Sequence, residues 1–214
     1  LKTLPVKTIS IPKVEADDVI AYLSKSVITH PKDKSFIVSS DKDFLQLVDE
    51  NVVVYRPMEK EYYTPQTVID KYKLSPHNFI LHKTLLGDNS DKIKGVKGLG
   101  EKGLLKKFPE LIEKDMSWGD ILNICEEKIS EHLVYARIIH GRDDLEKNYK
   151  IMDLSNPMLS KEDKIWLDEI VASDNLPYYP DQFVSMYNED QIGGLIRNVE
   201  FWVKDCFNNL VIKK

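Results

Sequence analysis

Short apolar runs alternate with helix-forming segments along the first 74 residues, and this alternation restricts the fold more than any other feature of the sequence. Strands are predicted at Lys7–Ile11, Ser35–Ser40, Asn51–Tyr55 and Glu61–Tyr63, and helices at Val14–His30, Phe44–Val48 and from Pro65 onward, with Thr64 as N-cap. Strands that alternate with helices build a layered structure with a largely parallel sheet. The sequence therefore predicts an α/β fold.

Helical patterns without strands follow from Ser75 onward. Helices are predicted at Asn78–Leu86, Glu101–Phe108, Ile121–Asn148 with a break near Gly141, and Lys161–Val171, whereas residues 181–214 have a mixed pattern. Because Gly95–Gly100 separates the first two of these helices, we expect a helix-hairpin-helix motif. We place a soft domain boundary near residue 74, between an α/β part (1–74) and a helical region (75–214).

Composition indicates a globular protein of a reducing compartment. The 214 residues include only two cysteines, too few for a disulfide framework or a cysteine zinc site. No apolar run approaches the roughly 20 residues that span a membrane, so we expect a cytoplasmic protein without a membrane partner. The net charge is −5, yet six lysines and one acid lie between residues 92 and 107. This basic segment favours a polyanion that is contacted at defined points.

Three groups of carboxylates stand at predicted element boundaries. They are Glu15, Asp17 and Asp18; Asp41 and Asp43; and Asp88 and Asp91. The strand ends and helix starts of a parallel sheet share one edge, so the groups could meet there. Oxygen ligands without His or Cys favour Mg²⁺ or Mn²⁺, and two such ions can activate a water and clamp a phosphate. Each group alone also suits a helix cap or a turn, and only their joint occurrence favours a metal site.

A glycine-rich turn with lysines follows the third acidic group directly. Backbone N–H groups of such a turn can approach phosphate oxygens closely, and the lysines add charge. The alternative is a tight helix–helix turn with solvated lysines. The residues expected to bind DNA are Lys92, Lys94, Gly95, Val96, Lys97, Gly98, Gly100, Lys102 and Lys106.

Three motifs together resemble the 5′ nuclease, or flap endonuclease, family, which includes the 5′ nuclease domain of bacterial DNA polymerase I and phage 5′-exonucleases. They are Glu15-Ala16-Asp17-Asp18, Ser39-Ser40-Asp41-Lys42-Asp43-Phe44, and Gly87-Asp88-Asn89-Ser90-Asp91 leading into Gly95–Lys102. The resemblance covers about residues 7–110. It implies a PIN-like core, and a structure-specific 5′-3′ exonuclease or flap endonuclease of replication or repair, in a bacterium or a phage-infected cell.

The resemblance also implies which ligands are bound. Two Mg²⁺ ions, for which Mn²⁺ can substitute, are expected at all seven acids, with Asp17, Asp41, Asp43, Asp88 and Asp91 as the catalytic set. The expected substrate is double-stranded DNA with a 5′ flap, a nick or an RNA primer. The family often holds a monovalent cation such as K⁺ on carbonyls of the hairpin.

One part of the family pattern has no counterpart before Leu1. Family members begin with a strand that carries a metal-binding aspartate, followed by a helical arch. We therefore expect that a preceding segment or a separate chain completes the core, or that catalysis is lost. The alternative functions are a non-catalytic module that binds DNA structures, or a nuclease subunit that needs such a partner segment. A PIN-type ribonuclease does not require the hairpin, so Gly95–Gly100 counts against it.

Overall fold

The computed structural model describes residues 1–173, 176–190 and 194–211, with no side-chain description for residues 208–211. The chain divides into two compact units, one formed by residues 15–159 and the other by residues 1–14 and 160–214. Both sides of the boundary expected near residue 74 lie within the larger unit, and that boundary stays a prediction. None of the helices in the described ranges has the length and apolar character that crossing a membrane requires.

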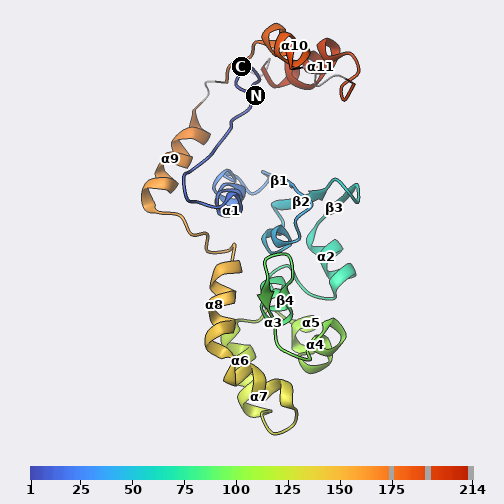
Figure 1. Cartoon of the computed structure of the whole chain (residues 1–214), viewed down its shortest axis with the longest axis vertical. Coiled ribbons are helices and arrows are strands. Elements are labelled where there is room, and N and C mark those ends of the chain that lie inside the picture. The colour runs from blue at the N-terminus through green and yellow to red at the C-terminus, as the bar shows by residue number, and fades with distance from the viewer. Residues whose placement is uncertain (174–175, 191–193, 212–214) are drawn as a thin grey trace. The chain divides into compact units, whose positions relative to one another are not determined.

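The α/β part of the larger unit is a small mixed sheet with helices beside it (Figure 1). Its elements are α1 (Ala16–Ser26), β1 (Ser35–Val38), the 3₁₀ helix η1 (Asp43–Leu47), β2 (Val52–Arg56), β3 (Glu61–Tyr63) and α2 (Pro65–Tyr72). β1 pairs in parallel with β2, and β3 pairs antiparallel with β2 at the edge. Thr64 caps α2 as expected, since its hydroxyl accepts from the N–H of Thr67. The predicted α/β class is confirmed.

Alternation along β2 positions the core of this part. Val52 and Val54 are fully buried, while the intervening Val53 is half-buried. The same cluster contains Phe44 and Leu45 of η1 and Phe79, the first residue of the helix that follows α2. Because η1 is anchored by these apolar side chains, the acidic turn that precedes it is held at the end of β1.

The rest of the larger unit is helical except for one short β-hairpin. Its elements are α3 (Phe79–Leu86), β4 (Gly87–Asp88), β5 (Ile93–Lys94), α4 (Glu101–Lys107), α5 (Glu110–Glu113), α6 (Trp118–Glu127), α7 (Leu133–His140) and α8 (Arg142–Met152). The helices predicted on both sides of Gly95–Gly100 are present as α3 and α4. The break at Gly141 is also present, but the predicted helix 121–148 has a second break at residues 128–132, where His132 caps α7.

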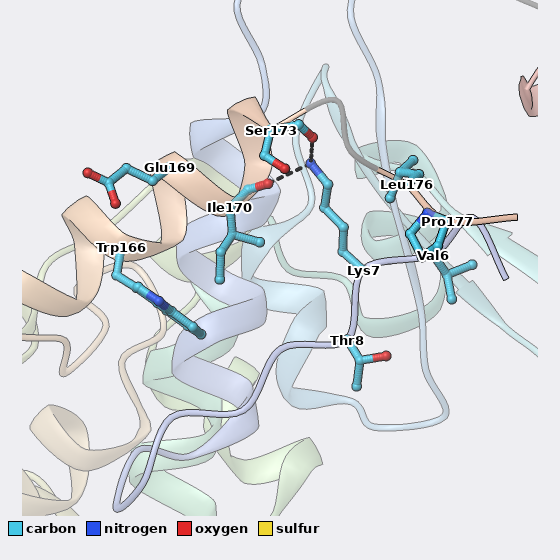
Figure 2. A pocket seen from close by; sticks show the side chains of 9 residues that line it. All are labelled: Val6, Lys7, Thr8, Trp166, Glu169, Ile170, Ser173, Leu176 and Pro177. Atoms are coloured by element: carbon cyan, nitrogen blue, oxygen red, sulfur yellow. Dashed lines mark hydrogen bonds between the residues drawn. The ribbon is translucent and has the colours of Figure 1, made fainter. Parts of the chain in front are cut away.

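The smaller unit contains α9 (Lys161–Ala172), α10 (Pro180–Glu189) and α11 (Val199–Val211). The strand predicted at Lys7–Ile11 is wrong, because these residues, all described, form no strand. Instead the Lys7 ammonium donates to the carbonyls of Ile170, Val171 and Ser173 at 2.6–2.7 Å, which caps the C-terminal end of α9 (Figure 2). A cavity of about 400 Å³ lies beside this contact and is lined by the half-exposed Trp166.

Two glycines fasten β4 to the turn that follows β5. Gly87 pairs with Lys94, and the backbones of Gly87 and Gly95 are in direct contact. A Cβ on Gly95 would lie 2.1 Å from the carbonyl carbon of Leu86 and 2.4 Å from the nitrogen of Gly87. Both of these neighbours are backbone atoms, which cannot move aside as a flexible side chain can. The acidic loop between β4 and β5 and the glycine hairpin are therefore one rigid piece.

We expect Gly95→Ala to lower the free energy of unfolding by about 3 kcal/mol, because the added methyl group overpacks a backbone contact. At this chain length the melting temperature falls by roughly 6–12 °C. Gly100→Ala is the matched control, since a Cβ there meets nothing within 4 Å and the φ angle is −120°. Thermal unfolding followed by circular dichroism measures both variants. Equal melting temperatures for the two would contradict the contact.

Candidate metal centre and nucleic-acid-binding hairpin

Three carboxylates from different segments converge at the end of β1. Asp43 begins η1, Asp88 ends β4, and Asp91 lies in the loop between β4 and β5. Each offers one carboxylate oxygen, and these oxygens all lie within 4.8 Å of one another. We call Asp43, Asp88 and Asp91 the acidic cluster. The sequence-predicted second and third acidic groups are therefore adjacent in space.

Lys83 of α3 is the counter-ion of this cluster. It is buried, forms an ion pair with Asp43, and places its ammonium 2.6 Å from a carboxylate oxygen of Asp88. Burial lowers the pKa of Lys83, but hydrogen bonds to the two aspartates outweigh burial and raise it above its ordinary value. Lys83 is therefore a permanent cation inside the cluster. Sequence reasoning missed it, although a single lysine in the apolar run of α3 was a usable signal.

Lys83 contacts both Asp43 and Asp88, but the pKa values of these two aspartates shift in opposite directions. Burial raises the pKa of Asp88, but hydrogen bonds from Lys83 and from Ser90 hold that pKa well below its usual range. Burial also raises the pKa of Asp43, and the charges of Asp41 and Asp88 add to this effect, so that Lys83 compensates only in part. Uncompensated negative charge is therefore concentrated around Asp43.

The remaining acids lie around this cluster with different surroundings. The pKa of Asp17 is raised, first by burial and then by the charges of Asp41, Glu15, Asp18 and Asp91. Asp17 therefore experiences the negative charge of all three acidic groups. Glu15 and Asp41 are exposed.

Asp18 has a structural partner that the sequence did not indicate. Its side chain is 8% exposed, and one carboxylate oxygen accepts the backbone N–H of Met158 at 2.8 Å. This hydrogen bond ties the start of α1 to the segment after α8. One oxygen of Asp18 is thus engaged in holding the fold.

The donor set of the acidic cluster suits a divalent cation. All three groups are carboxylates, and oxygens this close can share one ion at the 2.0–2.6 Å ligand distances typical of Mg²⁺ and Ca²⁺. Three carboxylates and one ammonium leave a net charge of −2. The residues present therefore fit a divalent metal ion.

A cavity of about 570 Å³ opens beside the cluster. Its lining includes Asp41, Asp43 and Asp88, together with Arg56 and His82, which sequence reasoning did not single out. Arg56 donates to the carbonyl of Ser40 at 2.8 Å and thereby supports the turn that carries Asp41. The cavity is large enough to admit a nucleotide-sized group next to the carboxylates.

The hairpin that follows presents its lysines to solvent. Lys92, Lys94, Lys97, Lys102 and Lys106 are all exposed. In the described part of the chain, the N–H groups of Gly98 and Gly100 have no backbone acceptor and are available to an anion.

Val96 differs from the expectation. Its N–H donates to the carbonyl of Leu85 at 2.8 Å, and its side chain is buried. The N–H of Val96 therefore holds the hairpin against α3 and is not available to bind a phosphate.

The comparisons with known proteins agree with this site. Residues 1–73 match the family described as 5′-3′ exonuclease, N-terminal resolvase-like domain. The 5′-3′ exonuclease of Aquifex aeolicus is 36% identical over 171 residues, which cover 76% of this chain and 54% of that protein. This chain is a homologue of the 5′-3′ exonucleases. The resemblance stated from the motifs is thereby confirmed. The chain spans about half the length of the Aquifex relative.

A second relative and two solved structures extend the comparison. The thermostable DNA polymerase I of Thermus thermophilus is 35% identical over 141 residues, which cover 61% of this chain and 16% of that protein. The 5′-exonuclease of bacteriophage T5 with bound zinc has a TM-score of 0.64 at 22% identity, covering 78% of this chain and 63% of that one. The bacteriophage T5 flap endonuclease in a complex with DNA and metal ions has a TM-score of 0.58 at 22% identity. The match covers 85% of this chain and 61% of that one. The PIN-like fold is confirmed.

We expect Lys83→Met to destabilise the protein by about 3–5 kcal/mol in EDTA, because it leaves partly buried carboxylates without their cation. Addition of Mg²⁺ raises the melting temperature of this variant more than that of the wild type, since the ion then meets a larger negative charge. Lys71→Met is the control: Lys71 also contacts two carboxylates, of Glu59 and Glu61, but at an exposed position. Its melting temperature changes little, with no added response to Mg²⁺. The same response in both variants would rule out the special role of Lys83.

Proposed function

We propose that this chain carries the metal-binding and duplex-binding parts of a structure-specific 5′ nuclease, which hydrolyses phosphodiester bonds in DNA or RNA-primed DNA. One observation carries the proposal: the Gly87–Gly95 contact joins the acidic cluster rigidly to the lysine-rich hairpin. Gly98 follows Asp91 by seven positions, so the two sites lie at most about 25 Å apart. A duplex held by the hairpin can thus reach the cluster with its backbone.

The proposed cofactor is Mg²⁺, for which Mn²⁺ can substitute. The acidic cluster would hold one ion, and Asp17 and Asp41, with Glu15 and the free oxygen of Asp18, would hold a second. When bound, such ions supply activation of the attacking water and neutralisation of charge on the scissile phosphate. The all-carboxylate donor set supports this choice over zinc.

The side chains of the chain itself have three roles in this proposal. Lys83 keeps Asp88 ionised and fixes the distance between Asp43 and Asp88. Gly98 and Gly100 offer N–H groups to phosphate oxygens, and the lysines around them attract the backbone without reading sequence. The cavity beside the cluster admits the sugar–phosphate unit that is cut.

The proposed substrate is a duplex with a 5′ flap, a nick or an RNA primer; the flap and the 5′ end agree with the names of the relatives, a 5′-3′ exonuclease and a flap endonuclease. Such DNA is processed in the cytoplasm of a bacterium or of a phage-infected cell, which is where we place the protein. Because the chain covers 54% of the Aquifex protein, the nuclease proposal concerns the whole protein that carries this chain.

Cleavage of a 5′-flap substrate in Mg²⁺ tests the proposed chemistry. Replacing Asp43 and Asp88 together by asparagine removes two anionic ligands, and we expect the rate to fall by at least about 100-fold. Asp70→Asn is the control, because Asp70 is exposed on α2 and, in the described part of the chain, its carboxylate accepts a hydrogen bond from Gln66 alone, so its rate stays within about twofold of wild type. Flap binding without cleavage by the intact protein favours the non-catalytic DNA-binding alternative. A rate that is equal in the double variant and the control overturns the metal assignment.

Binding of the duplex tests the hairpin. Replacing Lys97, Lys102 and Lys106 together by alanine makes the dependence of log K on log salt less steep by about 0.9 for each lost phosphate contact. The affinity falls equally for unrelated DNA sequences, because these contacts carry no base information. Lys32→Ala removes one exposed charge in the loop before β1 and leaves the slope unchanged. Fluorescence anisotropy titrations at four or five salt concentrations measure the slopes, and an unchanged slope in the triple variant argues against the hairpin.

A further inference from the structure

Arg137 of α7 reaches across to the glycine hairpin. Its Nη1 atom donates to the backbone carbonyl of Lys97 at 2.6 Å, a contact between residues that are 40 positions apart. A Cβ on Gly98 would lie 3.0 Å from the same nitrogen. The guanidinium therefore lies directly against the turn, in space that is open because residue 98 has no side chain.

Other carbonyls of the hairpin also have donors from the protein. Asn148 of α8 donates through its side-chain amide to the carbonyl of Lys94 at 3.2 Å. The carbonyl of Val96 accepts the N–H of Leu99 at 3.0 Å. Together with the bond from Arg137, three of the four carbonyls in residues 94–97 accept hydrogen bonds from the chain.

This arrangement does not fit the monovalent cation that the family resemblance implies at the hairpin. A K⁺ ion at the turn would have to take the Lys97 carbonyl from the guanidinium, because that carbonyl already accepts a hydrogen bond from Arg137. The guanidinium is always charged, so a second cation on the Lys97 carbonyl would also face a like charge at close range. The site already contains its cation.

We propose that the guanidinium of Arg137 takes the place of a bound monovalent cation and is a positioning residue for the hairpin. This inference rests on the proposed duplex-binding role of the hairpin. The guanidinium of Arg137 holds the Lys97 carbonyl and thereby fixes the orientation of the N–H groups that follow, those of Gly98 and Gly100. Duplex binding is consequently indifferent to which monovalent cation is in solution.

Binding of a flapped duplex at constant ionic strength tests this, with Ca²⁺ in place of Mg²⁺ and with chloride salts of K⁺, Na⁺ or tetramethylammonium. The wild type binds with the same affinity, within about twofold, in all three salts. Arg137→Met loses about tenfold in tetramethylammonium chloride, as expected when a charge-assisted hydrogen bond is removed, and K⁺ restores much of the loss. Arg137→Lys keeps the charge and stays insensitive to the cation.

Arg142→Met is the matched control, because Arg142 is an exposed arginine whose side chain, among the described residues, forms a hydrogen bond and an ion pair with the neighbouring Asp143 alone. It loses the same formal charge without any cation-specific effect. A wild type that binds more tightly in K⁺ than in tetramethylammonium overturns the inference. So does an Arg137→Met variant that behaves like Arg142→Met.

Thermal unfolding in the same salts separates this inference from the proposed function and checks that the variants fold. K⁺ raises the melting temperature of Arg137→Met relative to tetramethylammonium, but not that of the wild type. If the wild type binds no duplex in any salt, the proposed function fails, while the melting temperatures still decide the role of Arg137. If Arg137→Met does not fold, the dependence of wild-type duplex binding on the monovalent cation decides whether Arg137 replaces a bound cation.

Discussion

The close contact between the backbones of Gly87 and Gly95 is the constraint on which the candidate site depends. It closes a short β-hairpin whose loop carries Asp91, whose first strand carries Asp88, and whose exit leads directly into the lysine-rich turn. Any side chain at either glycine would push the two segments apart, and the carboxylates and the N–H groups of Gly98 and Gly100 would then move independently. A separation of only a few tenths of an ångström matters for ligands that must share one ion.

The acidic cluster depends on α3 because that helix supplies its counter-ion, Lys83. Asp43 and Asp88 come from different segments, and without Lys83 their mutual repulsion would open the site whenever no metal is bound. Lys83 is buried in a helix with a mostly apolar sequence, so the packing of α3 sets where the ammonium lies. The core of the helical part thereby helps to set the geometry of a site to which the α/β part contributes Asp43 and the rest of the unit contributes Asp88, Asp91 and Lys83.

Local patterns made much of this predictable. The carboxylates of the β4–β5 loop and the glycines after it are neighbours in sequence, and the element boundaries around β1 and β2 follow from apolar runs. Partners distant in sequence left no such pattern: Arg137 and Lys97 are 40 residues apart, and Asp18 and Met158 are 140 apart. At Lys7–Ile11 a local pattern was present but misleading. The alternating residues suit a strand, but a strand also requires a neighbouring strand to pair with.

The two halves of the site hold a side-chain cation in the same way and with opposite consequences. Lys83 sits among three carboxylates, so the cluster keeps a net charge of −2 and still attracts a divalent ion. Arg137 sits on a neutral carbonyl, so the hairpin has a net charge of +1 at that point and repels a further cation while it attracts phosphate. In the proposed function, the fixed cations would direct divalent metal ions to the acidic cluster and the polyanion to the hairpin, although the two lie on one rigid segment.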